Sequence, residues 1–140
     1  MTTTSTDTHV FVDTGAWFAL ADQSDSHHTE AAAVYSQLLQ TGSLLTTNLV
    51  IAETYTLIRR ALGRMAALRF LENIAASPRI AVVYSDARLE SIAEGLLRKY
   101  HDQDFSYTDA VSFAAMRECA VSRAFAFDKH FFTAGFALIP

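Results

Sequence analysis

The stretch VFVDTGAWFAL, residues 10–20, contains the pattern that decides the fold. Its apolar start suits a short buried strand that ends at Asp13, and TGAWFALAD continues as a helix. Further short strands are expected at residues 44–47, 79–85 and 123–128, with a helical turn and a short edge strand within residues 129–140. Single strands separated by helices, without hairpin signals, pair in parallel through crossovers. The sequence therefore predicts a three-layer α/β fold whose central parallel sheet of four to five strands is flanked by helices.

The composition is that of a globular protein. The 140 residues are 51% hydrophobic and 19% charged, and this length suits a single core. We expect a flexible N-terminal tail at residues 1–8 and one domain at residues 9–140. The N-terminus has no signal-peptide pattern and no run is long enough for a membrane span, so we expect a cytoplasmic protein. A formal charge of -4 disfavours broad, nonspecific attraction to nucleic acid.

Several residues mark where the expected elements begin and end. A helix that starts at Asn48, with this residue as its N-cap, should end at Gly63, and the next should end before Pro78. The apolar strand at residues 79–85 is of the kind covered on both faces. The single Cys119 has no disulfide partner and no zinc-site spacing, which is typical of a buried thiol.

Two carboxylates directly follow apolar strands. Asp13 ends the first strand and Asp128 ends the strand at residues 123–128. The carboxyl ends of parallel strands meet at one edge of the sheet, and ligands bind there in open α/β folds. Either residue alone could instead cap the helix that follows it. We therefore expect both side chains at the same edge, with helix capping as the alternative for each.

Glu53 is harder to explain as a local signal. On a helix it shares one stripe with apolar residues such as Val50, Leu57 and Ile58, so its carboxylate stands where a core residue is expected. Burying an unpaired carboxylate is costly. The alternative is a buried ion pair with an arginine from another element.

Two further acidic residues lie close together in DQDFSYTDAVSF, residues 102–113. Ser106 and Asp109 fit a capping box at a helix start, and Asp109 also shares a face with Phe113. Asp104 is near enough in sequence to join the same cluster. His130, two residues after Asp128, could reach this edge as well, but a surface histidine explains it equally simply.

A shared site would need positive charge. Two carboxylates about 4 Å apart repel by about 4 kcal/mol at an effective dielectric constant near 20, so several in one cleft cannot all stay ionised alone. Protonation or a bound cation resolves the conflict. Oxygen-only ligands suit the hard ions Mg²⁺ and Mn²⁺, and no Cys and His spacing here favours zinc.

The ordered segments VDTGAW, NLVIAETYTLIRR, DFSYTDAVSFAAM and AFAFDKHFFTAGF resemble those of a PIN-domain ribonuclease, specifically the VapC-type toxin of toxin-antitoxin systems. The resemblance runs from about residue 10 to residue 136. It implies a catalytic and metal-binding site for Mg²⁺ or Mn²⁺ made of Asp13, Glu53, Asp109 and Asp128, with Asp104 as a less certain metal ligand and Ser106 as a supporting hydroxyl.

The same resemblance implies endonucleolytic cleavage of an RNA substrate. It also implies a homodimer and a cognate antitoxin protein that places a basic side chain in the acidic site. Arg59, Arg60 and Lys129 are candidates for contacts to RNA phosphates, although solvated surface charge explains them too.

Other functions fit the sequence less well. A phosphoryl-accepting receiver domain needs paired acids after its first strand, and Asp13 stands alone. A haloacid-dehalogenase-type phosphatase needs an aspartate at the position of Gly15. The remaining alternative is a PIN-fold module that binds RNA or protein without cleaving it, and the presence of all four acids disfavours it.

Overall fold

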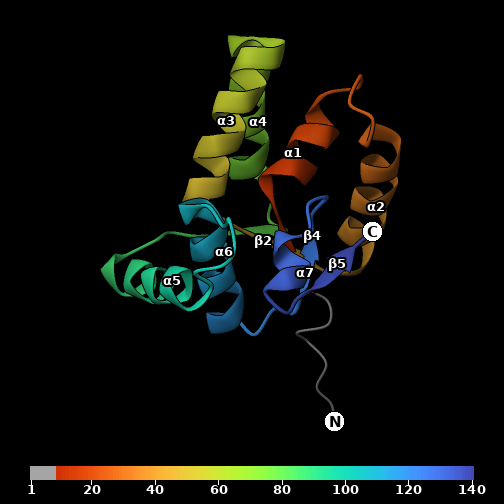
Figure 1. The fold of residues 1–140 in the computed structure, drawn as a ribbon. Helices are drawn as coiled ribbons and strands as arrows, with labels where there is room; N and C mark the ends of the chain where they lie inside the picture. The colour runs from red at the N-terminus through yellow and green to blue at the C-terminus, as the bar shows by residue number, and fades with distance from the viewer. Residues whose placement is uncertain (1–8) are drawn as a thin grey trace.

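The computed structural model describes residues 9–140, and the tail expected at residues 1–8 lies outside them. The described residues form a sheet surrounded by helices (Figure 1). The strands are β1 (His9–Val12), β2 (Ser43–Thr47), β3 (Ile80–Val83), β4 (Arg123–Phe125) and β5 (Ala137–Ile139). The helices are α1 (Thr14–Ala21), α2 (His28–Thr41), α3 (Asn48–Leu62), α4 (Arg64–Ala76), α5 (Ala87–Lys99), α6 (Tyr107–Glu118) and α7 (His130–Thr133).

All five strands are parallel, in the order β3-β2-β1-β4-β5. The first strand is central: Phe11 of β1 lies beside Leu45 of β2 on one side and beside Ala124 of β4 on the other. The chain therefore builds the sheet outward from β1, first toward β3 and then toward β5. The predicted parallel α/β sheet is confirmed, and the last strand is the short edge strand expected near the C-terminus.

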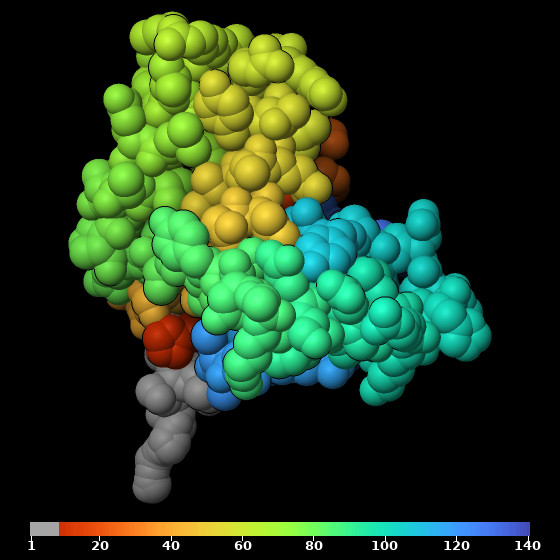
Figure 2. Space-filling view, turned by 90° about the vertical axis from the view of Figure 1, so that its left-hand side faces the viewer, coloured from red at the N-terminus to blue at the C-terminus, as the bar shows by residue number. Residues whose placement is uncertain are grey.

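The helices form a layer on each face of the sheet. Because the strand order reverses direction after β3, right-handed crossovers place α1 to α4 on one face and α5 to α7 on the other. Figure 1 shows α1 and α2 on the side of the sheet opposite to α5 and α6. The α3 and α4 hairpin extends away from the sheet, and Figure 2 shows it rising above α5.

The core is densest around β1 and α6. Val10, Phe11 and Val12 are fully buried because β1 has a neighbouring strand on each side and helices on both faces. Every residue of α6 from Asp109 to Met116 is buried. The Phe113 ring meets the Phe131 ring of α7 edge to face, with centroids 5.1 Å apart. These contacts hold α6 and α7 against the central strand.

Three local predictions are wrong. The N-cap of α3 is Thr47, whose hydroxyl accepts a hydrogen bond from Val50 N, while Asn48 Oδ1 accepts one from Ser85 N. The strand at residues 80–83 is an edge strand and only half-buried, because no strand of residues 9–140 pairs with its outer side. Cys119 is exposed because it lies just past the end of α6.

Among the helices of residues 9–140, none combines the length and the apolar character that a membrane span requires.

Candidate metal centre

A pocket of about 390 Å³ opens where β1 and β4 end. Asp13 directly follows β1, and Asp128 lies in the loop after β4. Glu53 from the middle of α3 and Asp109 from the first turn of α6 also line it, together with Asp25. The structure therefore brings together four acids that are widely separated in sequence, as the parallel topology predicts.

Asp13 is the most deeply placed of these acids. It is 6% exposed and occupies the N-cap position of α1, but its side chain makes no capping hydrogen bond. Burial raises the pKa of Asp13 from an ordinary 3.8 to about 7; the nearby Thr14 N–H offsets part of this rise. The charges of Asp128, Asp109 and Glu53 make smaller contributions to the same rise. Helix capping thus does not explain this carboxylate, whereas a shared acidic site does.

Glu53 reaches the pocket from an exposed position. The expectation that it replaces a core residue is wrong, because the buried stripe of α3 consists of Val50, Thr54 and Ile58. Glu53 lies on the flank of that stripe, where its Oε1 accepts a hydrogen bond of 2.8 Å from Thr14 Oγ1. No ion pair within residues 9–140 involves Glu53, so the structure does not support the alternative of a buried ion pair.

Asp109 combines two roles that the sequence left open. It forms the predicted capping box: Asp109 Oδ2 accepts a bond of 3.0 Å from Ser106 N, and Ser106 Oγ accepts one of 2.9 Å from Asp109 N. The same residue lines the pocket and is 8% exposed. Helix α6 therefore begins at the site and holds its acid in a fixed position through the capping box with Ser106.

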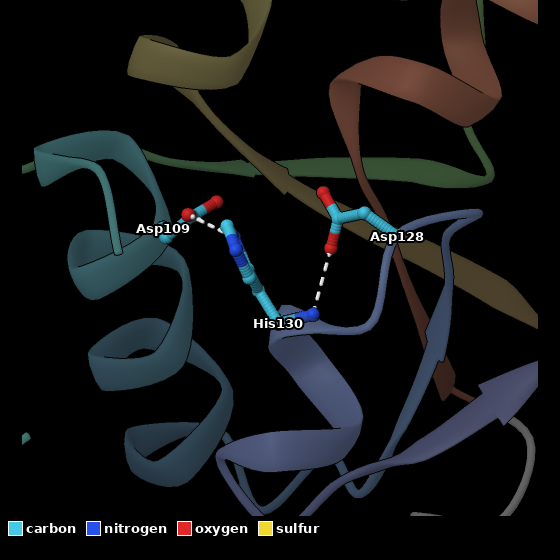
Figure 3. A group of neighbouring side chains, drawn as sticks. All are labelled: Asp109, Asp128 and His130. Carbon is cyan, nitrogen blue, oxygen red and sulfur yellow. Dashed lines mark hydrogen bonds and ion pairs between the residues drawn. The ribbon is translucent and has the colours of Figure 1, made fainter. Parts of the chain in front are cut away.

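His130 joins this group, although its sequence position gave it little weight. Its Nδ1 lies 2.9 Å from Asp109 Oδ2, and its backbone N donates to Asp128 Oδ1 at 2.9 Å (Figure 3). Asp109, Asp128 and His130 each offer a potential ligand atom, and these atoms lie within 4.8 Å of one another. The sequence signal that could have placed His130 near Asp128 is the turn in DKH, in which the aspartate side chain accepts a hydrogen bond from the backbone N–H two residues later.

Other candidate residues lie elsewhere. Asp104 is exposed and does not line the pocket. Arg59 and Arg60 are exposed in the last turn of α3, Lys129 is exposed beside Asp128, and none of the three lines the pocket. The remaining lining comes from residues that the sequence did not single out: Thr14, Gly15, Phe18, Asp25, His27, Leu57 and Phe127.

The donor set fits a divalent cation. The carboxylates around the pocket supply hard oxygen ligands, and their mutual repulsion adds to the burial that raises the pKa of Asp13. A bound cation would remove that repulsion. The acidic cluster is thus chemically suited to metal-assisted hydrolysis, with His130 fixing two of its members.

The comparison with protein families agrees with this geometry. The model of the PIN domain matches residues 10–137. The chain belongs to the PIN-domain family. The resemblance seen in the ordered acidic segments is therefore confirmed, and the receiver-domain and phosphatase alternatives are excluded.

Relatives within the PIN-domain family share most of the chain. The "23S rRNA-specific endonuclease VapC20" of Mycobacterium tuberculosis, found in strains CDC 1551 and H37Rv, is 35% identical over 127 residues, which are 91% of this chain and 95% of the relative. A crystal structure of M. tuberculosis VapC20, described as a sarcin-ricin loop cleaving toxin, superposes with a TM-score of 0.85 at 34% identity. That match covers 91% of this chain and 96% of the VapC20 chain.

Proposed function

We propose that this PIN domain is a metal-dependent endoribonuclease that hydrolyses RNA phosphodiester bonds. The observation that carries the proposal is the convergence of four carboxylates on one pocket, deep enough to raise the pKa of Asp13 to about 7. The endonuclease activity for which the VapC20 relatives are named supports the same reaction. Asp13, Glu53, Asp109 and Asp128 would hold Mg²⁺ or Mn²⁺ as the catalytic metal ligands.

When bound, the cation would polarise a phosphoryl oxygen and neutralise charge that develops during in-line displacement. The residues of the chain do the rest. A carboxylate of the cluster accepts the proton of the attacking water. Thr14 orients Glu53, and His130 orients Asp109 and Asp128, so that the acids are positioned before substrate arrives.

The proposal is tested by incubating the purified chain with structured and single-stranded RNAs in Mn²⁺, in Mg²⁺ and in EDTA. We expect internal cleavage with either cation and none in EDTA. Asp13→Asn should lower the cleavage rate by about 100-fold or more. The substitution removes a carboxylate charge that helps to bind the cation, and the bound cation would contribute several kcal/mol of transition-state stabilisation. Asp104→Asn is the matched control, since Asp104 is acidic and exposed but outside the pocket.

Cleavage that persists in EDTA, or at full rate in Asp13→Asn, would contradict the metal mechanism. RNA binding without cleavage under all conditions would favour the non-cleaving module instead.

The partners follow from the same proposal. The RNA to test first is the sarcin-ricin loop of 23S rRNA, because VapC20 is named for that target.

We propose that the chain is the toxin of a toxin-antitoxin pair. It acts in the cytoplasm as a homodimer of one-domain subunits, and it is inhibited by a cognate antitoxin that places a basic side chain in the acidic pocket. Induced expression should arrest growth, and co-expression of the neighbouring reading frame should relieve the arrest.

A further inference from the structure

A stacked pair of rings forms part of the pocket wall. The imidazole of His27 lies on the ring of Phe127 with centroids 4.1 Å apart and an interplanar angle of 14°. Both residues line the acidic pocket. Other ring pairs in the described residues, such as the three at the core ring of Phe113 with angles of 32°, 78° and 87°, are tilted or meet edge to face. A near-parallel pair at the pocket thus differs in geometry from the core aromatic contacts.

The pair is held in place from both sides. Asp25 Oδ1 accepts a hydrogen bond of 2.8 Å from His27 N, and His27 O accepts one of 2.8 Å from Ala31 N. Phe127 packs edge to face against Phe125 of β4, with centroids 6.0 Å apart. The two rings therefore come from well-fixed segments about 100 residues apart in sequence.

One face of the pair remains accessible. The His27 side chain is 50% exposed although Phe127 covers one face of its ring, so the opposite face is turned to solvent. The carboxylate of Glu30 approaches His27 Nδ1 only to 3.9 Å, which is too far for a hydrogen bond. A half-exposed imidazole contributes little to the core, and its flat outer face is available to extend the stack.

We propose that the His27 and Phe127 stack binds an unpaired nucleobase of the RNA. This inference rests on the proposed ribonuclease function. Aromatic rings bind splayed-out bases by stacking, largely independently of base identity. Phe127 directly precedes Asp128, which places the stack next to the proposed metal ligands. A pocket of about 390 Å³ is within the usual size range for a ligand site and has room for one nucleotide.

In this arrangement the acidic end of the pocket would receive the scissile phosphate when a cation is bound there, while the ring stack receives a neighbouring base. The stack orients the strand and does not take part in bond cleavage. His27 and Phe127 are therefore positioning residues, and their loss should appear in RNA affinity and KM more than in kcat.

The binding test uses a short single-stranded RNA that carries 2-aminopurine at successive positions. The Asp13→Asn chain with Mn²⁺ serves as the background, so that the RNA stays intact. At one position the fluorescence should be quenched by stacking. Adding His27→Ala should remove that quenching and weaken RNA binding by about 10-fold, whereas His27→Tyr should preserve both. His101→Ala is the matched control, because His101 is exposed and outside the pocket.

The kinetic test compares the same His27 and His101 variants in the otherwise unchanged chain. His27→Ala should raise KM about 10-fold and leave kcat nearly unchanged. For the parent chain, an RNA that is abasic at the quenched position should have a higher KM than the intact RNA. For His27→Ala, the abasic and the intact RNA should have the same KM. A lowered melting temperature with unchanged quenching and KM would show that the stack only joins two loops, and would overturn the inference. Quenching that depends on His27 without any cleavage would sustain the base site and remove the proposed nuclease function. If neither quenching nor cleavage is observed, both the base site and the proposed nuclease function are contradicted.

Discussion

The pocket has a buried floor and an exposed rim. Both regions carry carboxylates, but the charge of these carboxylates affects folding differently in the two regions. The floor consists of Asp13 and Asp109, which are 6% and 8% exposed. The rim consists of Glu53 and Asp128, both of which are exposed. Charge on the floor is coupled to folding because water cannot screen it, whereas charge on the rim is largely free of that coupling. This difference explains how a pocket can be lined with acids without each of them costing the same folding energy.

The largest expected effect is the pH dependence of stability in the metal-free chain, and it sharpens the contrast between floor and rim. Between pH 4 and pH 7 the folded chain keeps a proton on Asp13 that the unfolded chain has lost, because burial raises the folded pKa to about 7 from 3.8. The free energy of unfolding should therefore fall as pH rises through this window, by at most about 4 kcal/mol from this group. Urea unfolding in EDTA from pH 4 to pH 8 measures the fall.

Asp13→Asn should remove most of that pH dependence, because an amide does not titrate in this range. Saturating Mn²⁺ should reduce the dependence in the unchanged chain by stabilising ionised carboxylates. A parent chain whose stability rises between pH 5 and pH 7 in EDTA would contradict the coupling of floor charge to folding.

Asp109→Ala should have the next largest effect on stability. The substitution removes the bond from Ser106 N and leaves His130 without its carboxylate partner, although Ser106 still caps α6. We expect a loss of about 1 kcal/mol in the free energy of unfolding, together with loss of RNA cleavage. Urea unfolding at pH 5 isolates the capping contribution, because Asp13 is then protonated in the folded chain and repels Asp109 little.

Glu72→Ala on α4 is a matched control for this change, since Glu72 is an exposed helical acid outside the pocket. If both alanine variants unfold alike, Asp109 does not support the fold, and the distinction between floor and rim fails at this residue.

Glu53→Gln should have the smallest effect on stability. Its carboxylate is exposed and bonded to Thr14, so the amide should change the free energy of unfolding by less than about 0.5 kcal/mol. Cleavage should nevertheless fall by about 100-fold, because the pocket loses a proposed metal ligand. Melting curves and cleavage assays on the same preparation separate the two effects. Marked destabilisation would instead show that the Glu53 carboxylate supports the fold and would place Glu53 with the floor.

Much of the fold could be predicted because its signals are local. The run from Val10 to Asp13 is apolar and then acidic, which marks a strand end, and the pair Ser106 and Asp109 marks a helix start within four residues. Gly63 ends α3 as expected, with a positive φ of 96° that suits glycine. Each of these features depends on neighbours in the chain, so a sequence pattern is sufficient to predict it.

Glu53 shows where that kind of prediction fails. Helical periodicity correctly placed it beside Val50 and Ile58, but periodicity does not say which part of a stripe another element covers. The α3 and α4 hairpin extends beyond the sheet, so residues on the stripe's flank stay in solvent (Figure 1). The proposed role of Glu53 survives, for a different reason from the one that the sequence suggested.

By itself the sequence determined the parallel α/β class, the PIN-domain family and the order of the four acids, because alternating strands and helices and short capping motifs are encoded by adjacent residues. Tertiary structure alone decided three features. These are the shift in the pKa of Asp13, the approach of His130 to Asp109, and the stacking of His27 on Phe127. Each depends on side chains from distant segments whose separation in space is set only when the helices pack on the sheet.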